Sequence, residues 1–128
     1  MPYIDWGFYN SLFDKITDED SFNRIYKKAE LYFDTHTHFR TKTFMKEFDE
    51  TIASDFEIMK ANAIKMTICE LINNMFIQEM SEMGIGISSV SNDGYSESYK
   101  ITTAAEKEIQ LMMVIRSGLS GTGLAGAL

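Results

Sequence analysis

The longest regular pattern of apolar residues in the chain runs from about Ser54 to Met83. Apolar side chains recur there at the three- and four-residue spacing of one helix face, and they are Ala61, Ile64, Ile68, Leu71, Ile72, Met75 and Phe76. Ser54 can cap this helix, and Gly84 with Gly86 would end it. It would be about 45 Å long, and we expect it to form the centre of a bundle. Its polar side is expected to face solvent and holds Glu70, Asn73, Asn74, Gln78 and Glu82.

A second helix is predicted from Thr17 to about Thr35. The residues Thr17-Asp18-Glu19-Asp20 provide a cap and an acidic first turn, which suits the positive end of the helix dipole. The apolar face that follows holds Phe22, Ile25, Tyr26, Ala29, Tyr32 and Phe33. A short helical turn is then expected near Phe44 to Glu50, in a segment that folds back on the core through Phe39, Phe44, Met45 and Phe48.

A period of two residues replaces the helical period at about 85–101, and it predicts a β-hairpin. Asn92-Asp93-Gly94 is a tight-turn signal, and beyond it Tyr95, Glu97, Tyr99 and Ile101 alternate with polar residues. An isolated hairpin is marginal in water, so its strands must pack on the helices of the same chain or on a neighbouring subunit. Tyr95 and Tyr99 are therefore candidates for a contact between subunits.

The last helix is predicted to begin at the capping box Thr103-Ala-Ala-Glu106 and to run to Arg116 or Ser117. Residues 118–128 follow as a tail, in which three leucines are spread among four glycines. Because glycine costs backbone entropy in any ordered element, we expect this tail to be neither a stable helix nor a core element by itself. It is predicted to be a docking segment that gains order on a partner protein.

The N-terminal arm carries many aromatic residues, namely Tyr3, Trp6, Phe8, Tyr9 and Phe13. Such a segment must pack somewhere, and a cap over the chain's own core is the favoured interpretation. The alternative is a contact with a neighbouring subunit, because aromatic residues dominate the energetics of interfaces. Trp6 and Tyr9 are the candidates for that contact.

Composition narrows the class of protein. The 128 residues are 45% hydrophobic, enough for one core, so we expect a helical-bundle domain over 1–117 and a tail over 118–128. The net charge of -7 argues against nucleic-acid binding through a basic face. No signal peptide or membrane-spanning stretch is recognisable, so a soluble protein made in a cytoplasm is expected.

Candidate chemistry is sparse. Cys69 is the single cysteine and lies in a helical pattern, so it is interpreted as a small buried apolar residue. His36 and His38 are two residues apart, but without a third ligand in a recognisable pattern they predict no metal site. No phosphate-binding loop or nucleophile motif is present in the sequence. We therefore predict a protein that is not an enzyme and needs no cofactor.

The order of segments resembles that of the head–tail connector proteins of tailed bacteriophages, also called adaptor or head-completion proteins. Residues 29–40 look like the family's first helix, which runs into an aspartate and then a threonine and an arginine. Residues 86–99 are similar to its serine-rich ribbon, and Leu119-Ser-Gly-Thr-Gly-Leu124 to its terminal signature, the most specific piece. The resemblance spans about Asp20 to Leu124. The last four residues, 125–128, lack the aromatic or basic residue that often follows the signature.

This resemblance implies a mainly α fold, a small helical bundle that assembles as a ring of about twelve subunits under the portal vertex and extends the DNA channel toward the tail. The residues implied in docking to the portal protein are Leu119, Ser120, Gly121, Thr122, Gly123 and Leu124. A stopper or tail-completion protein would be the second partner. Genomic DNA would pass without sequence-specific binding, and the protein would lie in the virion after assembly in the host cytoplasm.

Three other functions stay open from the sequence. The first is a phage stopper or tail-completion protein, and the second is a small helical regulator that binds another protein. The third is an enzyme whose site would be assembled from His36, His38 and nearby acids.

Overall fold

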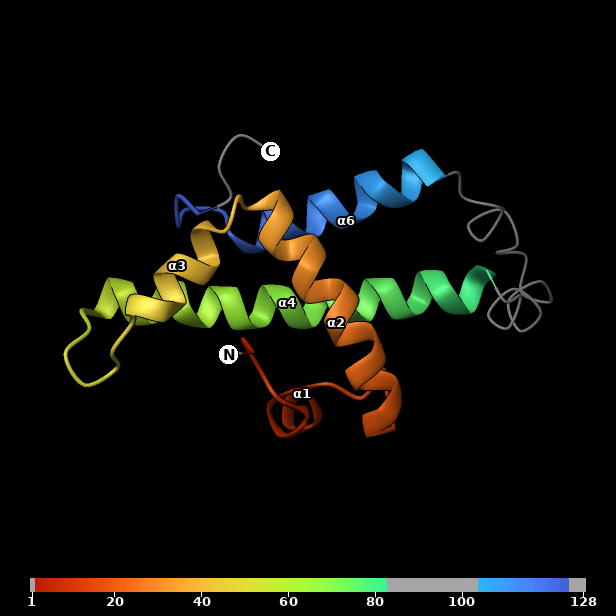
Figure 1. Ribbon diagram of the computed structural model, residues 1–128, viewed down its shortest axis with the longest axis horizontal. Helices are drawn as coiled ribbons and strands as arrows, with labels where there is room; N and C mark the ends of the chain where they lie inside the picture. Colours follow the sequence, from red (N-terminus) through yellow and green to blue (C-terminus); the bar gives the residue numbers. More distant parts are fainter. Residues whose placement is uncertain (1, 83–103, 125–128) are drawn as a thin grey trace.

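The fold is mainly helical, as the apolar pattern predicts. The computed structural model describes residues 2–82 and 104–124 (Figure 1). The helices in these ranges are α1 (Trp6–Leu12), α2 (Glu19–His36), α3 (Arg40–Glu47), α4 (Asp55–Glu82) and α6 (Ala104–Gly118). Neither range contains a strand, and the predicted hairpin at about 85–101, with Tyr95 and Tyr99, lies outside them. None of the described helices is long and apolar enough to cross a membrane.

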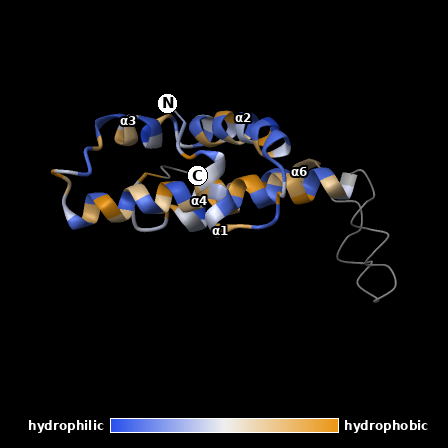
Figure 2. Ribbon diagram, turned by 90° about the horizontal axis from the view of Figure 1, so that it is seen from below, coloured by the Kyte–Doolittle hydropathy of each residue, from blue (hydrophilic) through white to orange (hydrophobic). Residues whose placement is uncertain are grey.

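The helices form two layers. α4 and α6 run antiparallel in one layer, and α2 crosses α4 in the other, with α3 beside it (Figures 1 and 2). The short helix α1 packs against α2 on the flank of α4. The long central helix predicted from the sequence is therefore confirmed, and every other part of the bundle is arranged around it.

The core lies where the two layers meet. Its fully buried side chains come from the arm, α2, α4, α6 and the turn after α6, and they include Tyr9, Ile16, Phe22, Ile25, Phe33, Ile64, Ile68, Leu71, Ile72, Ile115 and Leu119. Removing each such side chain from water contributes about 1.5–3 kcal/mol, so this cluster provides most of the stabilisation of the fold.

Side-chain caps set the starts of the two longest helices. Asp18 accepts a hydrogen bond from the backbone N–H of Ser21 at 2.9 Å, so it is the capping residue of α2. Ser54 and Glu57 form a reciprocal box before α4, with each backbone N–H bonded to the other side chain at 3.1 and 3.2 Å. The start of α4 agrees with the predicted cap at Ser54, and α2 is capped by Asp18, one residue after the predicted start at Thr17.

The corner between α2 and α3 differs from the prediction. His38 and Phe39 adopt positive φ angles of 54° and 60°, and the N–H of Phe39 bonds to the Asp34 carbonyl at 2.8 Å. α3 begins at Arg40 rather than near Phe44. The residue before it makes no side-chain cap, so no start signal for this helix could be recognised in the sequence.

Candidate interaction surface

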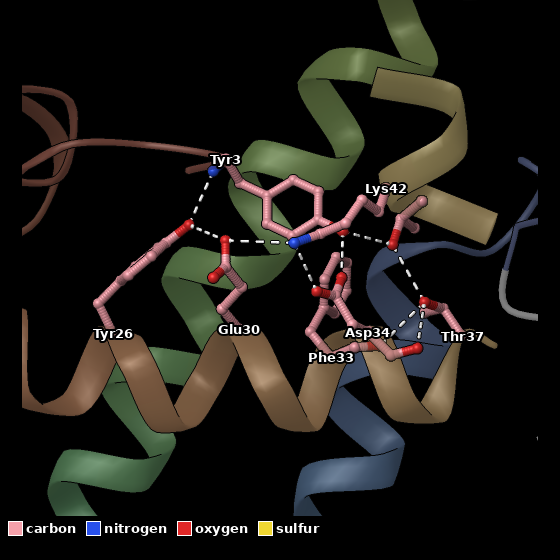
Figure 3. A network of polar contacts seen from close by, with 8 residues as sticks. Tyr3, Tyr26, Glu30, Phe33, Asp34, Thr37 and Lys42 are labelled. Carbon is pink, nitrogen blue, oxygen red and sulfur yellow. Dashed lines mark hydrogen bonds and ion pairs between the residues drawn. The ribbon is translucent and has the colours of Figure 1, made fainter. Parts of the chain in front are cut away.

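A buried polar network fastens the N-terminal arm to the corner between α2 and α3 (Figure 3). The Tyr3 hydroxyl donates to the Asp34 carboxylate and lies 3.0 Å from the Thr41 hydroxyl. The Lys42 ammonium contacts the same carboxylate at 3.0 Å. The Tyr26 hydroxyl accepts the backbone N–H of Tyr3 at 2.7 Å. The arm, α2 and α3 are thereby joined at one point.

Burial fixes the protonation states in this network. Desolvation, together with the hydrogen bond to Asp34, raises the pKa of Tyr3 far above its ordinary range. Desolvation likewise raises the pKa of Tyr26, and the hydrogen bond to Asp34 raises the pKa of Lys42. The phenols therefore stay neutral and the lysine stays charged at neutral pH. The network joins the arm to α2 and α3 through one buried carboxylate. Asp34 is thus the residue of α2 that anchors the arm.

The two aromatic residues proposed for contacts between subunits lie in different environments. Tyr9 is fully buried, donates its hydroxyl to the Asn73 amide oxygen at 2.5 Å, and accepts the N–H of Ile16 at 3.0 Å. It is a core residue, so its assignment to a subunit interface is corrected. Trp6 is half-buried with its ring centroid 5.6 Å from that of Phe22, and its contact with a neighbouring subunit stays a prediction. The arm is thus a cap over the core of its own chain.

The histidines do not come together as a site. His36 joins α2 to α6, because one ring nitrogen lies 3.0 Å from the Tyr32 carbonyl and the other 3.1 Å from the Glu108 carboxylate. His38 lies exposed at the corner after α2. Within the described ranges no group of three His, Cys, Asp or Glu side chains could hold a metal ion.

The first half of the glycine-rich tail is ordered against its own chain. Leu119 is 1% exposed and belongs to the core, and Thr122 is buried as well. The expectation that the tail contributes nothing to the core is therefore wrong for Leu119. Leu111, Ile115 and Leu119 are four residues apart, so the face of α6 that packs on α4 continues one step beyond the helix end.

Glycines serve as turn residues in this tail. Gly121 and Gly123 have φ angles of 82° and 77°, which side chains disfavour, and they let the chain turn back after α6. The Thr122 hydroxyl donates to the Leu119 carbonyl at 2.6 Å and accepts the Leu124 N–H at 3.1 Å. Of the residues implied in portal docking, Ser120, Gly121 and Gly123 are exposed, and Leu124 is half-buried against the core.

The central helix is apolar on two sides, and the other helices that the structure describes cover only one of them. Ala61, Ile64, Ile68, Leu71 and Ile72 are buried under the other helices. The opposite side exposes Phe56, Met59, Met66 and Ile77. Figure 2 shows apolar residues along the whole of α4. We name these four exposed residues the outer stripe of α4.

The predicted polar side of this helix is only partly solvated. Asn73 binds Tyr9 of α1, and Gln78 donates to the Gln110 side chain and to the Lys107 carbonyl of α6 at 3.1 and 3.3 Å. These amides are half-buried and join helices, so the prediction of a purely solvated side is wrong for both. The sequence does contain a signal for the outer stripe, which was missed. Residues 56, 59, 63 and 66 form a second apolar series at helical spacing.

An open groove runs beside the outer stripe, between α4 and α6. Its volume is about 470 Å³, and its lining consists of Ala63, Met66, Thr67, Glu70, Met113, Val114, Ser117 and Gly118. Met66 is 41% exposed and Met113 51%, so the mouth is formed by two methionines. Methionine side chains adapt easily to a partner surface. Glu70 is the one charged residue in this described lining.

The described residues of the groove and the outer stripe are mostly apolar, and the polar side-chain groups in the groove lining are the Thr67 and Ser117 hydroxyls and the Glu70 carboxylate. Comparison of the chain with protein-family models, curated proteins and solved structures gives no significant match.

Proposed function

We propose that the protein is a structural, non-enzymatic subunit of a phage head–tail connector, which forms a ring of about twelve copies on the portal and extends the DNA channel toward the tail. The observation that supports an assembly role is the outer stripe of α4, with Phe56, Met59, Met66 and Ile77 exposed in the single chain. Full burial of such a side chain contributes about 1.5–3 kcal/mol, and covering the exposed half, as binding to another protein would, contributes about half of that.

The class of assembly is proposed from the sequence. Residues 29–40, 86–99 and 119–124 occur in the order that connector proteins show, and the bundle formed by the described residues is compatible with that class. In a ring, each contact can be weak. Once the first copy is held on the portal, every later copy binds at high effective concentration.

Docking to the portal is proposed to use the exposed part of the ordered turn after α6. Its accessible residues are Ser120, Gly121, Gly123 and Leu124. The sequence predicts a docking segment that gains its order on the portal. The turn is instead already fixed by Leu119 and Thr122, so it would lose less conformational entropy on binding.

The negative charge supports the proposed position in the DNA channel. With a net charge of -7, the chain repels a passing duplex, so packaged DNA would slide through without sticking. A stopper or tail-completion protein would bind the other end of the ring. The proposed location is the head–tail interface of the virion, after assembly in the host cytoplasm.

Co-expression with the portal protein of the same genome tests this function. Native mass spectrometry and electron microscopy of the purified complex should show a ring of about twelve copies on the portal. A Ser120→Glu variant, altered at an exposed position, should lose portal binding while keeping its helical content and melting temperature. A chain that stays monomeric beside the portal contradicts the proposal and favours the small helical regulator.

A further inference from the structure

We infer that the groove between α4 and α6 receives the outer face of α2 from a second copy of this chain. The contact point of that face is Leu31, which is 68% exposed. This inference rests on the proposed ring, and it names the two surfaces that would form it.

The lining of the groove favours a partner surface that combines an apolar side chain with a basic neighbour. Met66 and Met113 flank an apolar floor that includes Ala63, and Glu70 places one carboxylate in the lining. A partner that covers the groove must neutralise this carboxylate, because an unpaired buried charge is costly. An apolar side chain next to a lysine meets both requirements.

The outer face of α2 has this composition. Lys27 and Lys28 precede Leu31 by four and three residues, so all three lie on one side of the helix, and all are exposed. Ile52 is even more exposed at 83%, but its neighbours in the loop include Asp49 and Glu50. Acidic neighbours would bring like charges to the groove. Charge complementarity therefore selects Leu31 over Ile52.

A pair of identical grooves packed on each other fits less well. Such a symmetric contact would bring Glu70 into the interface without a cation, since none occurs among the described residues that line the groove. The contact between unlike surfaces supplies Lys27 or Lys28 instead. The occupant that fits the groove is thus a different surface of the same chain.

The two surfaces lie on opposite sides of the subunit. α2 covers the side of α4 that carries Glu79, whose carboxylate binds Arg24 of α2 at 2.7 Å. Glu79 is sixteen residues from Ala63 in the groove lining, and at about 100° per residue the two positions point in nearly opposite directions. A contact from one side of a subunit to the opposite side of the next is head-to-tail, and it closes into a ring when the rotation between copies permits.

Two charge variants test this contact. Met113→Glu adds a second carboxylate to the groove and leaves the α2 face unchanged. Leu31→Glu replaces the apolar contact of the α2 face with a carboxylate and leaves the groove unchanged. Both positions are at least half exposed, and glutamate is a good helix former, so both variants should fold. Each alone should weaken self-association by about a hundredfold or more. Ile52→Glu is the matched control and should assemble like the natural chain.

Mixing the two variants gives the decisive result. The intact α2 face of one should dock in the intact groove of the other, so sedimentation should show a one-to-one complex that grows no further. Disulfide trapping tests the contact even where self-association is too weak for sedimentation. Oxidising a mixture of Leu31→Cys and Met113→Cys chains should give a mixed disulfide. An Ile52→Cys chain in place of the Leu31→Cys chain should give none. Failure to form either the complex or the disulfide overturns the inference.

The outcomes also separate this inference from the proposed function. Self-association of Leu31→Glu at the natural strength would show that α2 is not the occupant, even if the natural chain forms rings on the portal. Conversely, a one-to-one complex of the two variants, with no binding of the natural chain to the portal, would establish the contact and refute the connector role.

Discussion

Gly118 is the point where the end of α6 touches α4, and replacing it with alanine tests how firmly the tail is held. A Cβ at this position would lie 2.1 Å from the Thr67 hydroxyl oxygen and 2.8 Å from both Thr67 Cβ and Cγ2. Thr67 has little freedom to move, because it is buried and its hydroxyl donates to the Ala63 carbonyl at 2.6 Å. The helices must separate or Thr67 must leave its preferred geometry.

The expected loss can be worked from two opposing effects. Forcing a methyl group into a packed contact costs about 1–3 kcal/mol. Alanine gains up to about 1 kcal/mol over glycine in a helix. Gly118→Ala should therefore lower the free energy of unfolding by about 1–2 kcal/mol, and the melting temperature by several degrees. Urea unfolding followed by circular dichroism measures this change.

A second substitution shows whether Thr67 is the cause. Thr67→Ala removes the hydroxyl oxygen and Cγ2, two of the three atoms that would clash, so the double variant should be more stable than the sum of the two single changes predicts. Ser117→Ala, at an exposed position of the same helix, is the matched control and should have little effect. A Gly118→Ala variant as stable as the natural chain would refute the close contact between α6 and α4.

Four further predictions concern the core and its charged groups. Leu119→Ala should lower the free energy of unfolding by about 2–4 kcal/mol in urea, because it opens a cavity in the core. Asp34→Asn should lower it by about 1–3 kcal/mol, because Lys42 loses a buried ionic partner. Burial raises the pKa of the Cys69 thiol to about 12, so Ellman's reagent at pH 8 should label it only as fast as the protein opens. The hydrogen bond from Arg24 lowers the pKa of Glu79, so its stabilisation is present above the ordinary glutamate pKa and is lost as the pH falls through the lowered value.

Matched variants keep these predictions open to refutation. Leu12→Ala, at an exposed position, should change stability little, and equal losses at positions 12 and 119 would show that Leu119 is not in the core. An Asp34→Asn variant with unchanged stability would show that the ionic contact of Asp34 does not stabilise the fold. Immediate labelling of Cys69 in the folded protein would contradict its burial. The Arg24→Ala variant should lack the stabilisation by Glu79 that the natural chain shows above the ordinary glutamate pKa, and an unchanged pH profile would argue against that pair.

The sequence predicted α2 and α4 well because their start signals are local, whereas the helix α1 in the aromatic arm was not predicted. Asp18 and Ser54 cap helices by contacts within three residues, and the apolar period of α4 is long enough to be unambiguous. The α2–α3 corner was misplaced because Phe39 begins a helix through its backbone angle alone. Such angles depend on tertiary contacts that a residue list does not display.

The candidate surface was harder to predict, for two physical reasons. Glycine content suggested a shapeless tail, yet the order of that tail comes from Leu119 continuing the spacing of Ile115, a contact that only the packing of α6 on α4 creates. The outer stripe was missed because Asn73 and its polar neighbours predict a solvated side of the helix. The partner of Asn73, Tyr9, is 64 residues away in the sequence, so local spacing does not reveal their contact.

The same long separation bears on how the molecule folds. α2 and α4 can pack through their own apolar faces, whereas the arm depends on both, through Asp34 in one and Asn73 in the other. Closing so long a loop is entropically costly, and we expect docking of the arm to be among the last steps of folding. Until then Phe22 lacks the cover of Trp6 and Tyr9, so the intermediate would be the species most prone to aggregate.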